Sequence, residues 1–339
     1  MKKYDVIVIG SGPGGEGASM KLAKEGKIVA VIEDFPEVGG NCTHIGTIPS
    51  KSLRYLSVRL SEKELLNKTY PEIVALADNV IREQVELRQK FYLRNNVDVI
   101  NGWAKFIDEH TIEVSKTNIL PKKYEADYFI IATGTSPYHP DNIDFNHPRI
   151  LDSNTILDYN DDPKTVTIYG SGVIACEYSS IMKRLSKKVN LIHPNDKLLS
   201  FLDDEIIDAL SYHLRDVGVV IRANEEIDKV IADDNCVIIY LKSNKIIKSD
   251  VLLYAHGRVG NTTNMGLEQI GIETNNRKMI VINENYQTNI KHIYAVGDVI
   301  GYPGLASASY DQGRFAAEHI VHGKCNRVLI LSLIHISEP

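Results

Sequence analysis

A glycine-rich turn that joins an apolar strand to a helix occurs twice in this chain of 339 residues. The first copy follows Val6–Ile9 and begins at Gly10, and the second follows Thr165–Tyr169 and begins at Gly170, 160 residues later. In each copy a segment of helical periodicity and then another apolar run come next. This order of elements is typical of a doubly wound α/β fold with a parallel sheet. The sequence therefore predicts two separate α/β folds of the Rossmann type within one chain.

The first turn has the spacing G-x-G-x-x-G at Gly10, Gly12 and Gly15, with Pro13 inside it. The first glycine permits the tight turn, the second lets the backbone approach a pyrophosphate, and the third lets helix and strand pack closely. The free N–H groups at the helix N-terminus favour phosphate. Glu33 ends the next apolar run, 23 residues after Gly10, where a carboxylate can accept hydrogen bonds from ribose hydroxyls. The first fold is therefore predicted to bind a dinucleotide.

The second turn ends in alanine, which this kind of site tolerates, and no acid stands where Glu33 stands in the first copy. The polar side chains nearest to the end of its second strand are His193, Asn195 and Lys197. An acid there would repel a 2′-phosphate, whereas neutral or basic groups can accept one, so this site is not built to exclude NADP. The alternative that these residues are a solvated loop stays open. The residues predicted to contact a nucleotide here are Gly170, Gly172, Val173, Ile174, Ala175, His193 and Lys197.

Other segments have clear periodicity. A long amphipathic helix is predicted from the spacing of five apolar residues, and its stripe is expected to pack in the core. Those residues are Ile73, Leu76, Val80, Leu87 and Phe91. A second helix is predicted over Asp203–Asp216, closed by Gly218. The remaining expected elements are helices over 16–26 and from the second turn to about 185, and strands at 28–32, 188–192, 237–240 and 251–254.

Charge and cysteine content exclude several classes of protein. The net charge of −6 gives no basic surface, so nucleic acid is not an expected partner. No apolar run approaches the roughly 18 residues of a membrane span, and Val6–Ile9 is too short for a signal-peptide core, so a cytoplasmic protein without a membrane partner is expected. Four cysteines are too few and too scattered for a disulfide scaffold or a zinc site, and no metal is expected.

Residues 38–54 carry the most specific motif of the chain, Val-Gly-Gly-Asn-Cys-Thr-His-Ile-Gly-Thr-Ile-Pro-Ser-Lys-Ser-Leu-Arg. This segment resembles the redox segment of the FAD-dependent pyridine nucleotide-disulfide oxidoreductases. Residues 132–134 (Ala-Thr-Gly) and Gly257-Arg258 with Asn261 resemble the two crossover motifs of that family, and 294–298 resembles the strand whose aspartate binds the flavin ribityl chain. The resemblance covers about residues 4–325. It implies FAD in the first fold and a nicotinamide nucleotide in the second, as two dinucleotide folds in one chain also indicate.

The redox pair of that family, C-x-x-x-x-C, is incomplete here. Cys42 is present, but the second position is Thr47. A threonine hydroxyl cannot form a disulfide, and dithiol chemistry needs both an attacking and a resolving thiol. Cys236 and Cys325 lie far away in the sequence and outside the family motifs. Reduction of lipoamide, glutathione disulfide or trypanothione is therefore not expected.

The same segment is similar to the transhydrogenase branch of the family, which implies hydride transfer between NADPH and NAD through FAD. With the flavin as the sole carrier, turnover would be ping-pong, and both nicotinamide nucleotides would use one site in turn. Lys51 and Glu177 are implied as the catalytic residues, as a buried pair that places positive charge beside the flavin. Cys42 is expected near the flavin without a redox role, and Cys176 as a packed helix residue. The alternatives are an NAD(P)H diaphorase or quinone reductase and a non-catalytic FAD-binding fragment.

The resemblance also supplies a set of cofactor-binding residues. Those assigned to FAD are Gly10, Gly12, Pro13, Gly15, Glu33, Gly40, Cys42, Thr43, Lys51, Ala104, Thr133, Gly134, Asp298 and Ala306. Those assigned to the nicotinamide nucleotide add Glu177 and Gly257 to the residues of the second turn.

The expected domains follow from the same motifs. Residues 1–145 with 266–330 form a discontinuous FAD-binding domain, and residues 146–265 form the NAD(P)-binding domain inserted into it. The C-terminal interface domain of the family is expected to be missing, and residues 331–339 are expected to be a non-native, adapter-derived tail. A homo-oligomer is expected for the full-length protein and is not assigned to this shorter chain.

Overall fold

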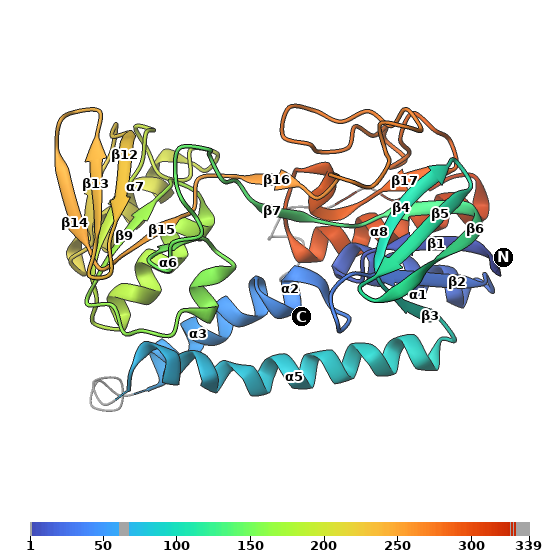
Figure 1. Cartoon of the computed structure of the whole chain (residues 1–339), viewed down its shortest axis with the longest axis horizontal. Helices are drawn as coiled ribbons and strands as arrows, with labels where there is room; N and C mark the ends of the chain where they lie inside the picture. The colour runs from blue at the N-terminus through green and yellow to red at the C-terminus, as the bar shows by residue number, and fades with distance from the viewer. Residues whose placement is uncertain (1, 61–67, 326, 328, 330–339) are drawn as a thin grey trace. The chain divides into compact units, whose positions relative to one another are not determined.

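The computed structural model describes residues 2–60, 68–325, 327 and 329, which form two compact units (Figure 1). Unit 1 combines the chain up to Thr47, the segment Arg82–Ser136 and the chain from Val259 onward. Unit 2 combines Ile48–Ile81 with Pro137–Arg258. The chain therefore passes between the units four times. Within the described residues, no helix is long and apolar enough to cross a membrane.

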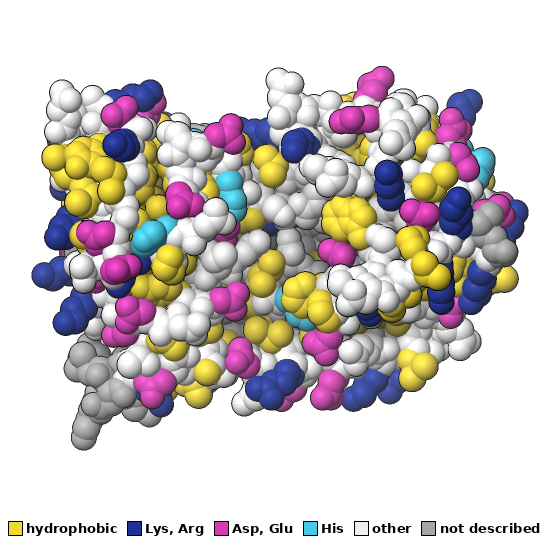
Figure 2. Space-filling model, in the orientation of Figure 1, with side chains coloured by type: hydrophobic (Ala, Val, Ile, Leu, Met, Phe, Trp, Pro, Cys, Tyr) yellow, Lys and Arg dark blue, Asp and Glu magenta, His cyan; other side chains and the backbone are white. Residues whose placement is uncertain are grey.

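These units divide the chain differently from the expected domains in three segments. Residues 137–145 were expected in the FAD-binding domain and lie in unit 2, and residues 259–265 were expected in the NAD(P)-binding domain and lie in unit 1. Residues 48–81 were expected in the FAD-binding domain, whereas the structure places them in unit 2. The identity of the nucleotide bound by each unit stays a prediction at this point, and the expected tail at 331–339 lies outside the described residues. Figure 2 shows acidic and basic side chains interspersed over the visible face.

Unit 1 is built around a seven-stranded sheet. Its strands are β1 (Lys2–Ile9), β2 (Val29–Glu33), β3 (Asp98–Asn101), β4 (Trp103–Asp108), β5 (Thr111–Lys116), β6 (Ile119–Ile131) and β17 (Ile293–Ala295). The order is β3-β2-β1-β6-β5-β4, and β17 also pairs with β6. β1, β2, β3, β6 and β17 run parallel, and β4 and β5 are antiparallel. Because Ile9 lies beside Ile32 and Ile131, the parallel strands end at one carboxyl edge.

Glycines bring two helices of unit 1 unusually close together. The helical segments are α1 (Pro13–Lys24), α2 (Gly40–His44), η2 (Gly297–Ile300) and α8 (Ala306–His322). A Cβ at Gly17 would overlap the carbonyl oxygen of Tyr310, and a Cβ at Gly313 would overlap that of Gly14. α1 begins at Pro13, three residues before the expected start, because proline fits the first helical position. This packing holds the start of α1 at the carboxyl edge of the sheet (Figure 1).

Unit 2 contains a second parallel sheet, as the duplicated turn predicts. Its strands are β8 (Ile150–Leu151), β9 (Thr165–Tyr169), β10 (Lys188–Ile192), β11 (Val220–Arg222) and β15 (Val251–Tyr254). The order is β11-β10-β9-β15-β8, with all pairs parallel. The helical segments of this unit are α3 (Thr47–Arg59), η1 (Thr155–Asp158), α6 (Val173–Arg184) and α7 (Asp204–Asp216). The expected strands at 165–169, 188–192 and 251–254 are confirmed to the residue.

The remaining strands form two small sheets. β12 (Ile227–Ala232), β13 (Val237–Leu241) and β14 (Ile246–Ser249) make an antiparallel sheet of their own. The strand expected at 237–240 therefore lies in this sheet and not in the parallel one. β7 (Thr135–Pro137) and β16 (Arg258–Gly260) pair with each other, and each contains a point where the chain passes from one unit to the other.

The expected long helix is present as α5 (Tyr70–Arg94), but its apolar stripe was assigned to the wrong face. Ile73 is buried, whereas Leu76, Val80 and Leu87 are 40%, 41% and 41% exposed. The residues that α5 does bury include Ala77, Val85, Arg88 and Tyr92. The spacing of large apolar residues was misleading because a buried arginine and an alanine occupy the inner face.

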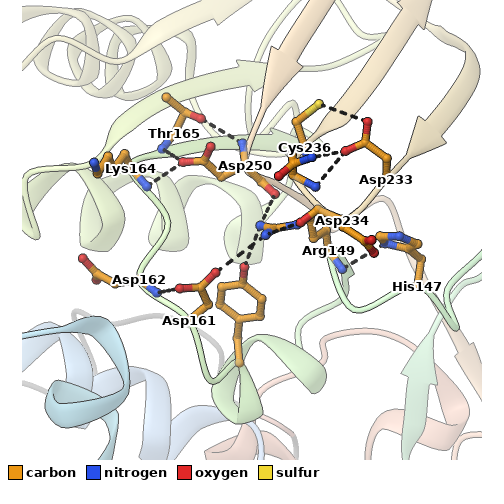
Figure 3. Close-up of polar contacts among 12 residues, drawn as sticks. His147, Arg149, Asp161, Asp162, Lys164, Thr165, Asp233, Asp234, Cys236 and Asp250 are labelled. Carbon is orange, nitrogen blue, oxygen red and sulfur yellow. Dashed lines mark hydrogen bonds and ion pairs between the residues drawn. The ribbon is translucent and has the colours of Figure 1, made fainter.

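Arg149 ties the amino end of the unit 2 sheet together (Figure 3). Its guanidinium donates to the carbonyl oxygen of Asp234 at 2.8 and 3.0 Å, to that of Asp250 at 3.2 Å, and to the hydroxyl of Tyr159 at 3.3 Å. The Asp250 carboxylate in turn accepts the backbone N–H of Thr165 at 2.8 Å. Arg149 thus connects the start of β8 to the loop before β13 and the start of β15, and the Asp250 carboxylate extends the network to the start of β9.

Replacing Arg149 with methionine is expected to lower the free energy of unfolding by about 2–4 kcal/mol, because several charge-assisted hydrogen bonds are lost and the partly buried acceptors on Asp250 and Tyr159 lose this donor. Urea denaturation measures this loss. Lys229, an exposed lysine on β12, is the control, and Lys229→Met is expected to change stability by less than about 0.5 kcal/mol. Equal effects of the two substitutions would contradict the role given to Arg149.

Candidate cofactor and nucleotide sites

The first glycine-rich turn lies at the carboxyl edge of the unit 1 sheet, between β1 and α1. Gly10 has φ +104°, and a Cβ there would overlap the carbonyl oxygen of Ala132. A Cβ at Gly15 would overlap the carbonyl oxygen of Gly10. Gly12 differs, because the nearest atom to a Cβ there is the Cα of Gly40 at 3.9 Å. Space is therefore left in front of Gly12, where the backbone is expected to approach a phosphate, and α1 begins without a side-chain cap on its N–H groups.

Glu33 stands at the end of β2 and is engaged with the turn itself. Its Oε2 accepts the backbone N–H of Ser11 at 2.8 Å and also the Ser11 hydroxyl, and its Oε1 accepts the N–H of Phe35 at 2.9 Å. The Ser11 hydroxyl accepts the N–H of Gly39 at 2.8 Å. These bonds fix the carboxylate and join the turn to the Cys42 segment. Contact between Glu33 and a ribose stays a prediction.

The segment around Cys42 packs directly on the glycine-rich turn. A Cβ at Gly40 would lie 2.7 Å from the Cα of Gly12. Cys42 makes a side-chain hydrogen bond with Thr47, so the two positions of the C-x-x-x-x-C motif are in contact although the second is not a thiol. Burial is the main influence on the Cys42 thiol and raises its pKa. A thiol with a raised pKa is a poor nucleophile, which agrees with the expected absence of a redox role.

The two crossover motifs interlock in unit 1. The Thr133 hydroxyl donates to the carbonyl oxygen of Asn261 at 2.8 Å, and the Asn261 amide donates to the carbonyl oxygen of Thr133 at 2.9 Å. The backbone N–H of Asn261 donates to Gly134 at 3.0 Å. The Thr133 hydroxyl thus donates its hydrogen within the protein, and toward FAD it is left only as an acceptor. Asn261 was noted in the sequence as part of a motif, and the structure shows what it does.

The remaining residues assigned to FAD lie in different surroundings. Asp298 is half-buried in η2, and its charge acts on the Cys42 thiol. Ala306 is the first residue of α8. Ala104 is buried within β4, among the apolar residues of the core. A flavin contact by these three residues stays a prediction.

Two observations test whether unit 1 fits FAD. The first is the open space at Gly12, beside N–H groups without a cap. The second is the Thr43 hydroxyl, which is fully buried and has no hydrogen-bond partner within the described residues. Buried hydroxyls are nearly always hydrogen-bonded, so an unpaired hydroxyl beside the turn indicates that a polar group of a ligand binds there. The residues therefore fit a dinucleotide such as FAD.

The second turn repeats this geometry in unit 2. Gly170 has φ +148°, and a Cβ there would overlap the carbonyl oxygen of Ala255. No atom of the described residues lies within 4 Å of a Cβ at Gly172, and α6 begins at Val173, ahead of Ile174, without a side-chain cap. Ala175 is fully buried and packs against Gly170. Gly257, with φ +106°, follows β15 and has a similarly open Cβ position.

Of the two polar residues assigned to the 2′-position, only His193 differs from the alternative of a solvated loop. His193 is only 1% exposed, and burial lowers the pKa of its imidazole, which favours the neutral form. Lys197 is half-buried, and its ammonium pairs with the Asp204 carboxylate at 2.7 Å. Asn195 donates to the Ser171 hydroxyl at 2.7 Å. Nucleotide contact by His193 and Lys197 stays a prediction, and Asn195 braces the turn.

Lys51 and Glu177 form an ion pair between α3 and α6, within unit 2. The expected burial of the lysine is wrong, since 59% of its side chain is exposed against 20% for Glu177. A long lysine stem lets the ammonium stay hydrated while it reaches a carboxylate. Beside this pair, Arg54 donates to the Ser180 hydroxyl at 2.8 Å, which explains why α3 belongs to unit 2. The role of the pair toward a flavin stays a prediction.

Sequence reasoning missed a buried ionic network under the first turn. Arg88 of α5 approaches the Glu16 carboxylate at 3.2 Å, and the Tyr310 hydroxyl donates to the same carboxylate at 2.9 Å. Burial is the main influence on Glu16 and raises its pKa, while Arg88 and Tyr310 act in the opposite direction. The sequence did hold one signal of this network. Arg88 is a charged residue at a position where the periodicity of the amphipathic helix places its buried face.

Comparison with known proteins finds one matching family and several similar sequences. Residues 4–313 match the family described as "Pyridine nucleotide-disulphide oxidoreductase". A soluble pyridine nucleotide transhydrogenase of Vibrio cholerae serotype O1 is 53% identical over 336 residues, which cover 96% of this chain and 72% of the relative. A transhydrogenase of the same description from Serratia proteamaculans is 52% identical, over 97% and 72% of the two chains.

Solved structures agree on the fold. The HOCl-induced flavoprotein disulfide reductase RclA from Escherichia coli is similar, with a TM-score of 0.86 and 27% identity over 96% of this chain and 72% of that one. LpdA from Mycobacterium tuberculosis gives a TM-score of 0.88 at 24% identity, over 97% and 74% of the two chains, and supports the fold alone. The predicted fold class is confirmed, and the chain belongs to the pyridine nucleotide-disulphide oxidoreductase family.

Proposed function

We propose that this chain transfers hydride between NADPH and NAD through a bound FAD, as a soluble pyridine nucleotide transhydrogenase. The observation that carries this function is the contact of Cys42 with Thr47, where the disulfide enzymes have a second thiol. The chain has two glycine-rich turns suited to phosphate, and the C-x-x-x-x-C motif has one thiol. The hydride can then pass from one nucleotide to the other by a route that contains no disulfide. The relatives that are 52–53% identical to this chain bear the same description.

In this proposal unit 1 holds FAD. The turn from Gly10 to Gly15 and the start of α1 bind the pyrophosphate. Glu33 accepts hydrogen bonds from the ribose hydroxyls, and the buried Thr43 hydroxyl donates a hydrogen bond to a polar group of FAD. A bound flavin supplies reversible acceptance of a hydride. The Cys42 thiol, with its raised pKa, takes no part in electron transfer.

Unit 2 holds one nicotinamide nucleotide at a time, on the turn from Gly170 to Ala175. Besides the turn assigned to FAD, the described residues contain one glycine-rich turn that can bind a nucleotide. NADPH therefore delivers its hydride and leaves before NAD enters. The Lys51–Glu177 pair is placed in this proposal beside the reacting ring of the flavin. Lys51 supplies positive charge there, and Glu177 orients the ammonium.

The kinetic test uses the purified chain loaded with FAD. NADPH is oxidised in the presence of thio-NAD, and initial rates are measured over a grid of both concentrations. Parallel double-reciprocal lines and mutual competitive inhibition are expected. Intersecting lines would show that both nucleotides are bound together, and rates with quinones far above those with thio-NAD would favour a diaphorase instead.

Disulfide substrates are expected to remain unreduced, because Thr47 offers no resolving sulfur. Lipoamide and glutathione disulfide should give no NADH oxidation above a control with free FAD. Thr47→Cys is the informative variant: since positions 42 and 47 are in contact, the variant is expected to lose two titratable thiols by forming a disulfide under air. A wild-type chain that reduces either substrate well above the control would contradict the proposal.

The remaining expectations belong to this proposal as well. We place the enzyme in the cytoplasm, with nicotinamide dinucleotides as its partners and neither nucleic acid nor a membrane. A homo-oligomer remains the expectation for the full-length enzyme.

A further inference from the structure

Two buried nitrogen atoms in unit 2 have no hydrogen-bond partner among the described residues. They are Nδ1 of His193, just after β10, and Nε of Arg222, the last residue of β11. Ile192 pairs with Arg222 across the two strands, and the backbone N–H of His193 donates to the carbonyl oxygen of Arg222 at 3.0 Å. Buried polar atoms of this kind are rare within folded proteins and need an explanation.

Their place in the fold is the one where a ribose is recognised. His193 stands 23 residues after Gly170, just as Glu33 stands 23 residues after Gly10. In doubly wound folds the residue at this point faces the adenosine ribose. Because β10 and β11 run parallel and Arg222 is the last residue of β11, Arg222 lies at the same carboxyl edge of the sheet. Arg222 is therefore a neighbour of the position that reads the 2′-group.

Arg222 is a cation at this edge, as is Arg215, whose charge acts on His193. Within the described residues no carboxylate forms an ion pair with Arg222, and the carboxylate its charge acts on, Glu225, is already bonded to Lys245 and Ser243. Lys197, the candidate from the sequence, is held by Asp204.

His193 does not supply the charge. Burial is the largest influence that lowers its pKa, and the nearby Arg215 lowers it further, while the backbone of Asn195 and the charge of Asp196 raise it. A neutral imidazole neither attracts nor repels a phosphate strongly, so it tolerates both a 2′-hydroxyl and a 2′-phosphate.

We propose that Arg222 binds the 2′-phosphate monoester of an adenosine ribose and thereby gives the site its affinity for NADP(H). The half-buried guanidinium presents a planar fork of donors, which matches a phosphate better than a lysine ammonium does. Nucleotides without the 2′-phosphate do not use Arg222 and bind through the turn at Gly170–Ala175. The inference rests on the proposed function, since it assumes that unit 2 binds pyridine nucleotides.

The test compares two ligands that differ only in the 2′-phosphate. Isothermal titration calorimetry measures the dissociation constants of 2′,5′-ADP and of 5′-AMP with the purified chain. Arg222→Gln is expected to weaken 2′,5′-ADP about 10- to 100-fold and 5′-AMP by less than about twofold. Lys188→Gln is the matched control, because it removes an exposed charge at the other end of the neighbouring strand, and it is expected to leave both constants within about twofold.

Two more variants keep the inference open to contradiction. Arg222→Lys retains the charge but loses the fork, and is expected to weaken 2′,5′-ADP less than Arg222→Gln does. If Arg222→Gln does not fold, as judged by thermal unfolding, Arg222→Lys decides the matter by a loss confined to 2′,5′-ADP. Lys197→Gln should have a smaller effect than Arg222→Gln, and the reverse order would overturn the assignment.

The outcomes separate this inference from the proposed function. Equal weakening of both ligands, or no weakening, would overturn the role of Arg222 and leave nucleotide binding by unit 2 intact. A wild-type chain that binds neither ligand would overturn the proposed function and the inference with it.

Discussion

Replacing Gly12 with alanine is expected to abolish FAD binding while leaving the apoprotein folded. The nearest atom to the new Cβ would be 3.9 Å away, which is ordinary contact, so the turn can accept the methyl group. That group fills the space in front of the N–H groups at the start of α1. Loss of two charge-assisted hydrogen bonds to phosphate amounts to about 3–6 kcal/mol, or more than about 100-fold in affinity. Quenching of FAD fluorescence on binding measures the affinity, and thermal unfolding of the apoprotein measures stability.

Gly15→Ala is the matched control for this prediction. Its Cβ would overlap the carbonyl oxygen of Gly10, so the turn itself must deform, and both FAD binding and apoprotein stability are expected to fall. A Gly12→Ala variant that retains wild-type affinity would show that the pyrophosphate does not lie over Gly12. A variant that unfolds as readily as Gly15→Ala would show that the space is needed by the protein itself.

Arg88→Met is expected to be among the most destabilising single changes in unit 1. The Glu16 carboxylate would remain buried without its cation, which costs about 3–5 kcal/mol at neutral pH. Burial already raises the pKa of Glu16 in the folded state, and Arg88 works against that rise. Urea denaturation across a pH series measures the effect.

The pH dependence of that loss follows from the direction of the pKa shift. A carboxyl whose pKa is raised by folding binds its proton more tightly in the folded state, so stability falls as pH increases from the ordinary value to the raised one. Without Arg88 the pKa of Glu16 rises further, and the deficit of Arg88→Met should therefore shrink as pH falls toward about 5. The double variant with Glu16→Gln is the control and should recover much of the stability at neutral pH. A deficit that is independent of pH would show that lost packing, and not the unpaired charge, is responsible.

Much of the fold could be read from local patterns. The two turns predict strand, turn, helix and strand because the roles of Gly10 and Gly170 depend on backbone geometry that few other residues adopt. β9, β10 and β15 matched their expected bounds because short buried strands of a parallel sheet are continuous apolar runs. The pairing of Lys51 with Glu177 came from the family resemblance, since no spacing rule links residues 126 positions apart.

What the sequence could not give depends on contacts between distant segments. The inner face of α5 was misassigned because Arg88 is buried by a partner, Glu16, that lies far away in the chain. Arg222 was overlooked because its strand, β11, is only three residues long and carries no motif. Nothing in the sequence indicated that Lys197 has a partner, and only the structure shows that its ammonium forms an ion pair with the Asp204 carboxylate.

The four passages of the chain between the units also have a consequence for the order in which a ribosome completes them. All of unit 2 has been synthesised once Arg258 has emerged, whereas unit 1 still lacks β17, which must insert beside β6. Strand pairing over more than 150 residues is slow to form, since it cannot begin before the later partner exists. The nascent chain therefore carries a finished unit 2 while the apolar edge of β6 waits for Ile293–Ala295. Aggregation during synthesis is expected to arise at that edge, and chaperone binding to ribosome-bound chains should end once residue 295 has cleared the exit tunnel.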